Sequence, residues 1–446
     1  MSLAKWTLGT FGAQIIGVFF LTLWGIINSR VLGPEGKGIV TLVFLYPDLF
    51  AFLFNLSLAT PFLHHLGRAK YKLGNFAANS LLLAGILGGL ALFVFCVTFF
   101  FAREQLYPKI SGIYLAPTML LTPFLMIISF SYAILQGSSN IRDLNLVGLT
   151  WKIGGAILVI LLVFILKLGV CGAIIGGSMA IFFTAVAGVY FVARITKKED
   201  WQIQPELLKE TLIDGSKLHI GGVAGYLSAK ANIFLLNYYL GAKEVGLFSV
   251  ALVVSWMLDI ISQSTQTVLC TKASSADEVE AARLTGLVVR HALLWTIIAG
   301  LILAAGAKLF IWLFAGKAFF AATLPLVILI PGMVARAISF NTNALIIRHR
   351  KFLWMTYIYC SLAVISITLC IILIPRYGLV GAALATIIPQ ILVAIIFIFI
   401  FCFLGKRGPK ELFCFTKEDF LLYKNLVARM YKKIIYLMKI GLQKNI

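Results

Sequence analysis

The chain reads Leu32-Gly33-Pro34-Glu35-Gly36-Lys37-Gly38 and, 208 positions later, Leu240-Gly241-Ala242-Lys243-Glu244-Val245-Gly246. A second pair of similar turns, 167–173 and 376–382, is separated by 209 positions. Two turns whose spacings agree to one residue predict an internal repeat that runs in the same direction in both halves. The preference of glycine for tight turns is the alternative explanation for the match.

The segments between these turns are too apolar for a soluble protein. Of the 446 residues, 61% are hydrophobic and 12% are charged, and the mean hydropathy is +0.99. A soluble domain has about a quarter of its residues charged, so most of this chain must have lipid as its solvent. The composition therefore predicts an all-α polytopic membrane protein.

About twelve apolar runs are long enough to cross roughly 30 Å of hydrocarbon as helices. The first run, Trp6 to Ser29, is too long for a signal-peptide core and is interpreted as the first span. The expected spans are 6–29, 38–63, 76–101, 113–137, 146–166, 170–193, 218–240, 246–270, 287–307, 320–347, 353–375 and 379–404.

The longest internal polar stretch predicts how the spans are grouped. It lies between the sixth and seventh spans, so the expected domains are an N-terminal six-helix lobe (1–193), a cytoplasmic linker (194–217) and a C-terminal six-helix lobe (218–404). Direct repeats with an even number of spans should be related by an axis along the membrane normal. Residues 405–446 are too polar to span the membrane. From Thr416 they predict a basic amphipathic helix on the cytoplasmic leaflet, with a docking site for partner enzymes as the alternative.

The distribution of basic residues predicts the orientation. One side of the predicted membrane receives 26 of the 38 Lys and Arg residues, the other side nine, and three lie inside spans. The positive-inside rule places both termini in the cytoplasm of a cell (inner) membrane. The net charge of +21 therefore indicates topology signals and contacts with anionic membrane lipids, and nucleic acid is not expected as a partner.

The turns that carry the repeat also resemble a known family. The stretches 30–38, 241–246 and 377–383 are similar to those of bacterial Wzx-type polysaccharide (O-antigen, lipopolysaccharide) flippases. These belong to the multidrug/oligosaccharidyl-lipid/polysaccharide exporter superfamily. The resemblance covers essentially all twelve spans. It implies two six-helix lobes around a central cavity with alternating access, and a lipid-diphosphate-linked oligosaccharide as the cargo.

Three basic residues lie inside predicted spans, where a charge is costly and usually functional. Lys230 and Arg336 are deep in spans seven and ten, and we expect them to line the cavity and bind the diphosphate. Lys152 is nearer the end of span five. It is the third candidate for substrate binding, with snorkelling of its ammonium group toward the lipid headgroups as the alternative.

Two acidic residues, Asp48 in span two and Asp259 in span eight, occupy similar depths in equivalent helices. They are candidates for charge pairing with Lys230 and Arg336, which would keep the buried charge neutral. The alternative is that one of them binds H⁺ or Na⁺ and couples transport to an ion gradient.

Two other classes of function are alternatives to a flippase. A cation-coupled multidrug antiporter of the same superfamily would need an acidic cavity, which only Asp48 and Asp259 could supply. An integral-membrane glycosyltransferase or polymerase would need catalytic groups in a sizeable outer loop, and every predicted outer loop is short. We expect no catalytic residues, no metal site and no cofactor, because neither metal-ligand spacing nor a phosphate-cradling glycine loop occurs. Polysaccharide-assembly proteins are possible partners.

Overall fold

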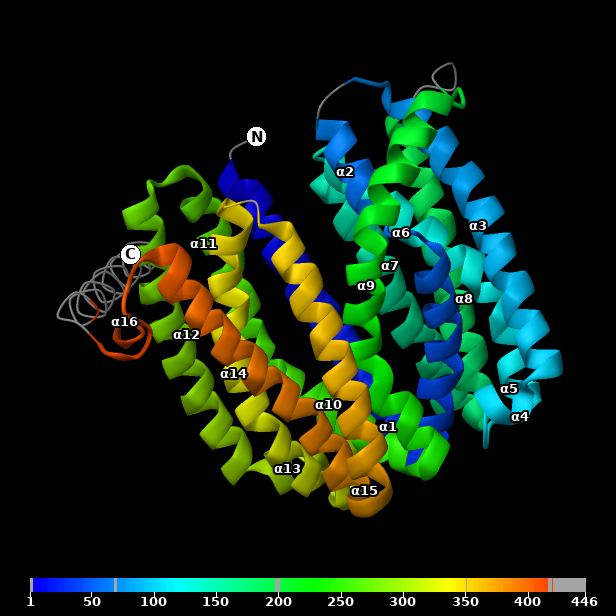
Figure 1. Ribbon diagram of the computed structural model, residues 1–446. Coiled ribbons are helices and arrows are strands. Elements are labelled where there is room, and N and C mark those ends of the chain that lie inside the picture. Colours follow the sequence, from blue (N-terminus) through cyan, green and yellow to red (C-terminus); the bar gives the residue numbers. More distant parts are fainter. Residues whose placement is uncertain (1–2, 68–69, 197–200, 350, 416–418, 420–446) are drawn as a thin grey trace, which may run out of the picture. The chain divides into compact units, whose positions relative to one another are not determined.

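The structure is a computed structural model that describes residues 3–67, 70–196, 201–349, 351–415 and 419. In these residues the regular elements are helices (Figure 1), with η2 a π-helix and η1, η4 and η5 3₁₀-helices. Their bounds are α1 Leu3–Phe54, α2 Ala59–Gly67, α3 Leu73–Phe101, α4 Arg103–Leu106, α5 Gly112–Leu115, η1 Ala116–Leu120, α6 Leu121–Gly137, α7 Ile141–Val159, η2 Ile160–Ile165, α8 Gly169–Ile195, α9 Pro205–Tyr239, α10 Ala242–Ser255, η4 Trp256–Leu258, α11 Asp259–Ser275, α12 Glu278–Ala305, α13 Ala307–Ala315, η5 Lys317–Ala322, α14 Thr323–Arg348, α15 Phe352–Gly405 and α16 Lys410–Phe413.

The described residues contain nine helical stretches long and apolar enough to cross a membrane. Two of them, Ala13–Phe54 and Leu353–Gly405, have 42 and 53 residues, about twice the length that one crossing requires. Each changes direction at a glycine with a non-helical backbone, Gly33 in α1 and Gly378 in α15, so each supplies two spans. Together with α9, which contains the predicted seventh span, these helices confirm the prediction of about twelve spans.

The turns quoted from the sequence have equivalent backbone conformations. Gly33 and Gly241 have φ values of 67° and 112°, and Gly169 and Gly378 have values of 59° and 56°. L-residues with side chains rarely adopt these conformations, so both members of each pair need glycine for the same reason. The repeat inferred from spacing is therefore also a repeat of local geometry.

Immediately after the first pair of turns, the second half of α1 crosses α10 with the two backbones in direct contact. A Cβ atom on Gly38 would overlap the carbonyl oxygen of Ala242, and a Cβ atom on Gly246 would overlap that of Pro34. Pro34 and Ala242 occupy equivalent positions in the repeat, as do Gly38 and Gly246. The crossing is therefore locally symmetric, with each segment making the same contact on the other.

The chain divides into two compact units that are interleaved along the sequence. The first unit comprises Met1–Trp256, Leu303–Ile330 and Leu353–Pro389, and the second comprises Met257–Ile302, Pro331–Phe352 and Gln390–Ile446. Within the first unit, α3 packs against α6, α6 against α8, and α1 against both α7 and α10. The division into lobes at 1–193 and 218–404 stays a prediction.

The stretch expected to be a linker is partly helical. Residues 205–217 form the first turns of α9, which continues without interruption into the seventh span. The side chain of Asn75 donates to the carbonyl of Gln202 at 2.8 Å, and Asn79 exchanges two hydrogen bonds with Gln204 at 2.9 and 3.0 Å. These bonds bind the segment that precedes α9 to α3. The predicted helix from Thr416 lies outside the described residues, except for Asp419.

Replacement of Gly38 or Gly246 by alanine should destabilise the protein. The added methyl group would overlap a backbone carbonyl that cannot rotate away, and overpacking of this kind costs about 1–3 kcal/mol or more. Thermal unfolding of the purified variants in detergent measures the effect. Gly25→Ala in α1 is the matched control, because a Cβ atom there meets nothing within 4 Å. A Gly38→Ala protein as stable as the control would contradict the close crossing.

Candidate functional site

The second half of α1 and the middle of α9 bring polar and aromatic side chains together in the first unit. The hydroxyl of Tyr226 donates to Oδ2 of Asp48 at 2.9 Å. Phe52, one helical turn after Asp48, stacks on the ring of Tyr226 with centroids 4.6 Å apart and planes 18° apart. Asp48 is thus held between two helices by a hydrogen bond that is itself fixed by ring packing.

Lys230 lies one turn after Tyr226 on α9 and is half-buried. Its ammonium nitrogen is 5.8 Å from the ring centroid of Trp256, and it interacts electrostatically with Asp48. Asp48 and Trp256 are equivalent positions in the repeat, 208 residues apart. Lys230 therefore lies near two equivalent positions of the repeat, one in α1 and the other directly after α10.

The second unit contains a separate ion pair. Nη2 of Arg336 on α14 lies 3.0 Å from Oδ2 of Asp259 on α11, and its Nε donates to Oδ1 at 3.2 Å. The carboxylate of Asp259 is 4% exposed and the guanidinium side chain 30% exposed. The guanidinium also lies over the ring of Phe340, 4.9 Å from its centroid. Two of the five N–H donors of Arg336 serve this forked contact, which leaves three for another acceptor.

Lys152 on α7 has a different setting. Its side chain lies against Gly17 of α1, where an added Cβ atom would come within 2.9 Å of Nζ. The absence of a side chain at Gly17 is what lets the lysine pack there. This contact places Lys152 beside the first half of α1, whereas Lys230 lies beside Asp48 in the second half.

The structure therefore brings the four deep charges together as two pairs, Lys230 near Asp48 and Arg336 on Asp259. The roles proposed for them in substrate binding and ion coupling stay predictions. The sequence did not single out Tyr226, Phe52 or Phe340. Tyr226 could have been found from its position one turn before Lys230, which puts both side chains on one face of α9.

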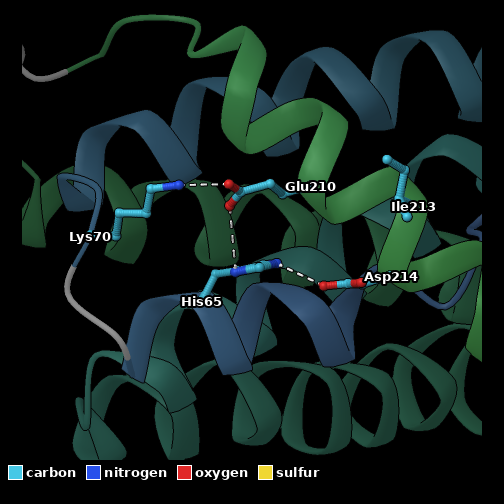
Figure 2. A pocket seen from close by; sticks show the side chains of 5 residues that line it. All are labelled: His65, Lys70, Glu210, Ile213 and Asp214. Atoms are coloured by element: carbon cyan, nitrogen blue, oxygen red, sulfur yellow. Dashed lines mark hydrogen bonds and ion pairs between the residues drawn. The ribbon is translucent and has the colours of Figure 1, made fainter.

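A second polar cluster lies outside the predicted spans, in a pocket of about 250 Å³ lined by His65, Lys70, Glu210, Ile213 and Asp214. Figure 2 shows the imidazole of His65, from α2, between two carboxylates of α9. Lys70 contacts Glu210 at 2.6 Å, and this contact holds the pKa of Glu210 below its usual range. The side chain of His65 is only 6% exposed.

Comparisons with known proteins agree with this architecture. Among solved structures, an inward-facing multidrug resistance MATE family transporter of the MOP superfamily has a TM-score of 0.72 and 16% identity over 87% of this chain and 95% of its own. The lipid II flippase MurJ, in an inward closed conformation, has a TM-score of 0.72 and 16% identity over 98% and 93%. A MOP superfamily transporter from Pyrococcus furiosus has a TM-score of 0.64 and 16% identity over 90% and 95%. The fold is that of a MOP superfamily transporter.

Residues 3–270 match the family described as "Polysaccharide biosynthesis protein". The match covers more than half of the chain, so the protein belongs to this family. A search of curated proteins finds no match.

The ion pair of the second unit should show coupled energetics. Arg336→Met leaves Asp259 buried without its partner and should lower the free energy of unfolding by roughly 1.5–3 kcal/mol. The double variant Arg336→Met/Asp259→Leu should recover most of this loss, because neither charge then remains buried alone. Thermal or denaturant unfolding measures the cycle, with Lys243→Met at an exposed position as the control. Additive effects of the two single substitutions would contradict the pairing.

Proposed function

We propose that the protein moves a lipid-diphosphate-linked oligosaccharide, a polysaccharide repeat unit, from the cytoplasmic to the outer leaflet by alternating access. Membership of the polysaccharide biosynthesis family supports a carrier of this class. The observation that carries the proposal is the position of Lys230. It is a deep cation near equivalent positions of the two repeats, Asp48 and Trp256, where a cargo handled by both repeats would meet it.

A diphosphate group can exchange partners with the existing charges. In the absence of cargo, Asp48 offsets the charge of Lys230, and Trp256 contacts its ammonium group, so the lysine is tolerated in the membrane. A diphosphate brings more negative charge than one carboxylate and would displace Asp48 as the main partner of Lys230. Tyr226, which donates to Asp48, would then stabilise the released carboxylate.

Arg336 is proposed as a second phosphate ligand. Asp259 fixes the plane of its guanidinium through two donors, and the remaining three can bind phosphate oxygens in the geometry that arginine favours. Lys152 is proposed as a third cation that meets the headgroup of the cargo near the membrane surface. Asp48 or Asp259 would be the place for H⁺ or Na⁺ if transport is coupled to an ion.

The multidrug antiporter is the second candidate, since several similar folds belong to multidrug transporters. Such a protein needs unpaired carboxylates to attract cationic drugs. Here each deep carboxylate already has a cationic neighbour, Lys230 for Asp48 and Arg336 for Asp259. The charge pattern therefore favours an anionic cargo. Raised resistance to cationic dyes in a sensitised host that expresses the protein would favour the antiporter over the flippase.

Localisation follows the same proposal. The protein is a multi-pass membrane protein, and we propose the cell (inner) membrane with both termini in the cytoplasm, where the precursor is assembled. Reporter enzymes that act only in the cytoplasm, fused after Lys5 and after Arg407, should both be active. Membrane lipids, the lipid-linked cargo and polysaccharide-assembly proteins are the expected partners.

Lys230→Ala and Arg336→Ala should each abolish surface-polysaccharide assembly in a host that depends on this gene, without loss of the protein from the membrane. Lys230→Arg should retain part of the activity, because the charge is kept and only the geometry changes. Surface polysaccharide is quantified by gel and immunoblot, and Lys243→Ala is the matched control at an exposed lysine. Complementation at the wild-type level by both alanine variants would contradict the proposed cationic site.

A further inference from the structure

The cluster around His65 has a geometry that the proposed transport cycle does not use. Nδ1 of His65 is 3.9 Å from Glu210, and Nε2 is 3.4 Å from Asp214 (Figure 2). Nε2 is buried and makes no hydrogen bond to another described residue. The two carboxylates are four residues apart, so they lie on the same face of α9. One imidazole therefore faces two acceptors, with no hydrogen bond from Nε2 to Asp214 and with Glu210 beyond hydrogen-bonding distance.

This arrangement fits one ligand in particular, a proton. A neutral imidazole has a single N–H, so it cannot donate to both carboxylates, and the ring nitrogen without a hydrogen would face a carboxylate oxygen. A protonated imidazole has two N–H groups and a positive charge, and its two nitrogens face the two acids. Small movements would turn both contacts into charge-assisted hydrogen bonds.

Each of the two acids around His65 also contacts a lysine. Lys70 contacts Glu210 at 2.6 Å and also lies over the ring of Tyr71, and Lys217 contacts Asp214 at 3.4 Å. The pKa of Glu210 is lowered by Lys70, so this carboxylate remains an acceptor as the pH falls through the range in which histidines titrate. The neighbouring His64 is exposed, and its ring centroid lies 5.6 Å from that of His65.

The cluster lies where α9 is attached to the first unit. α2 supplies His65, and α9 supplies Glu210 and Asp214. The adjacent residues Leu207 and Thr211 are fully buried. α9 then runs as one helix to Lys230, sixteen residues after Asp214 and about 24 Å further along its axis. A stronger attachment would therefore limit the movement of the helix that carries the proposed cargo-binding lysine.

We propose that His65, Glu210 and Asp214 form a cytoplasmic proton-binding site that fastens the start of α9 to α2 when His65 is protonated. The direction of the pH dependence follows from the charges of these groups. Protonation of His65 adds two attractive contacts, so the attachment is stronger at low pH and weakens as the pH rises and the imidazole loses its charge. In the transport cycle, the protonation state of His65 would determine how readily α9 separates from α2.

Hydrogen–deuterium exchange of the full-length protein in lipid nanodiscs tests the site without any transport assay. The backbone amides of residues 205–217 are compared at about pH 5.5 and about pH 8 at constant ionic strength. Labelling times are scaled for the intrinsic effect of pH, and peptides from α8 serve as the internal reference. We expect exchange in 205–217 to be slower at the lower pH by roughly threefold to tenfold, the effect of one or two partly solvated charged contacts.

Matched substitutions identify the titrating group. His65→Gln should abolish the difference between the two pH values, whereas His64→Gln, at the adjacent exposed histidine, should leave it unchanged. Glu210→Gln combined with Asp214→Asn should also abolish it, and this second route does not depend on how His65→Gln folds. Addition of a chelator should have no effect.

Three results would overturn the proposal. These are equal corrected exchange at both pH values in the wild type, persistence of the difference in His65→Gln, or loss of the difference on chelation, which would indicate a metal. Because the measurement needs no cargo, failure of the flippase proposal would leave it intact, and the converse also holds.

Discussion

The close crossing of α1 and α10 is the contact on which the central part of the molecule depends. Glycine at positions 38 and 246 lets each backbone lie against a carbonyl of the other helix, and a side chain at either position would push the helices apart. Because the two contacts are equivalent in the repeat, they relate the two segments by local symmetry. Asp48 and Trp256 follow at equivalent positions of these segments. Lys230 lies near both residues, so its setting depends on the close approach that the two glycines permit.

Two deep carboxylates in the described spans, Asp48 and Asp259, have cationic neighbours, and this pairing is relevant to the class of cargo. Lys230 has Asp48 nearby, and Arg336 holds Asp259 in a forked contact. A pair of this kind is tolerated in the membrane without cargo and can accept an anion by exchange of one acidic partner for another. A cationic drug would instead have to displace a lysine or an arginine that is part of the fold. An anionic headgroup thus needs the smaller rearrangement.

Much of this fold could be predicted from the sequence, because the length of apolar runs and glycine at left-handed turns are local properties. The four turn glycines are confirmed in conformation as well as in position. The choice of partners among the deep charges could not be predicted, since it depends on the rotation of each helix about its axis. The polar stretch 205–217 was expected to be a linker. It is helical because one of its faces, with Leu207 and Thr211, is buried against the first unit, a tertiary effect that overrides its polarity.

The continuity of α9 links the two polar clusters of the first unit. The helix contains no residue with a non-helical backbone between Asp214 and Lys230, whereas α1 and α15 both bend at a glycine. An unbroken helix transmits a displacement at one end to the other, while a bend would absorb it. Tyr226 and Lys230 also meet α1 through Asp48, so α9 is held at its start by α2 and in its middle by α1. A change that moves α9 away from α1 would therefore also act on its contacts with His65, which is how the proposed proton site would influence that movement.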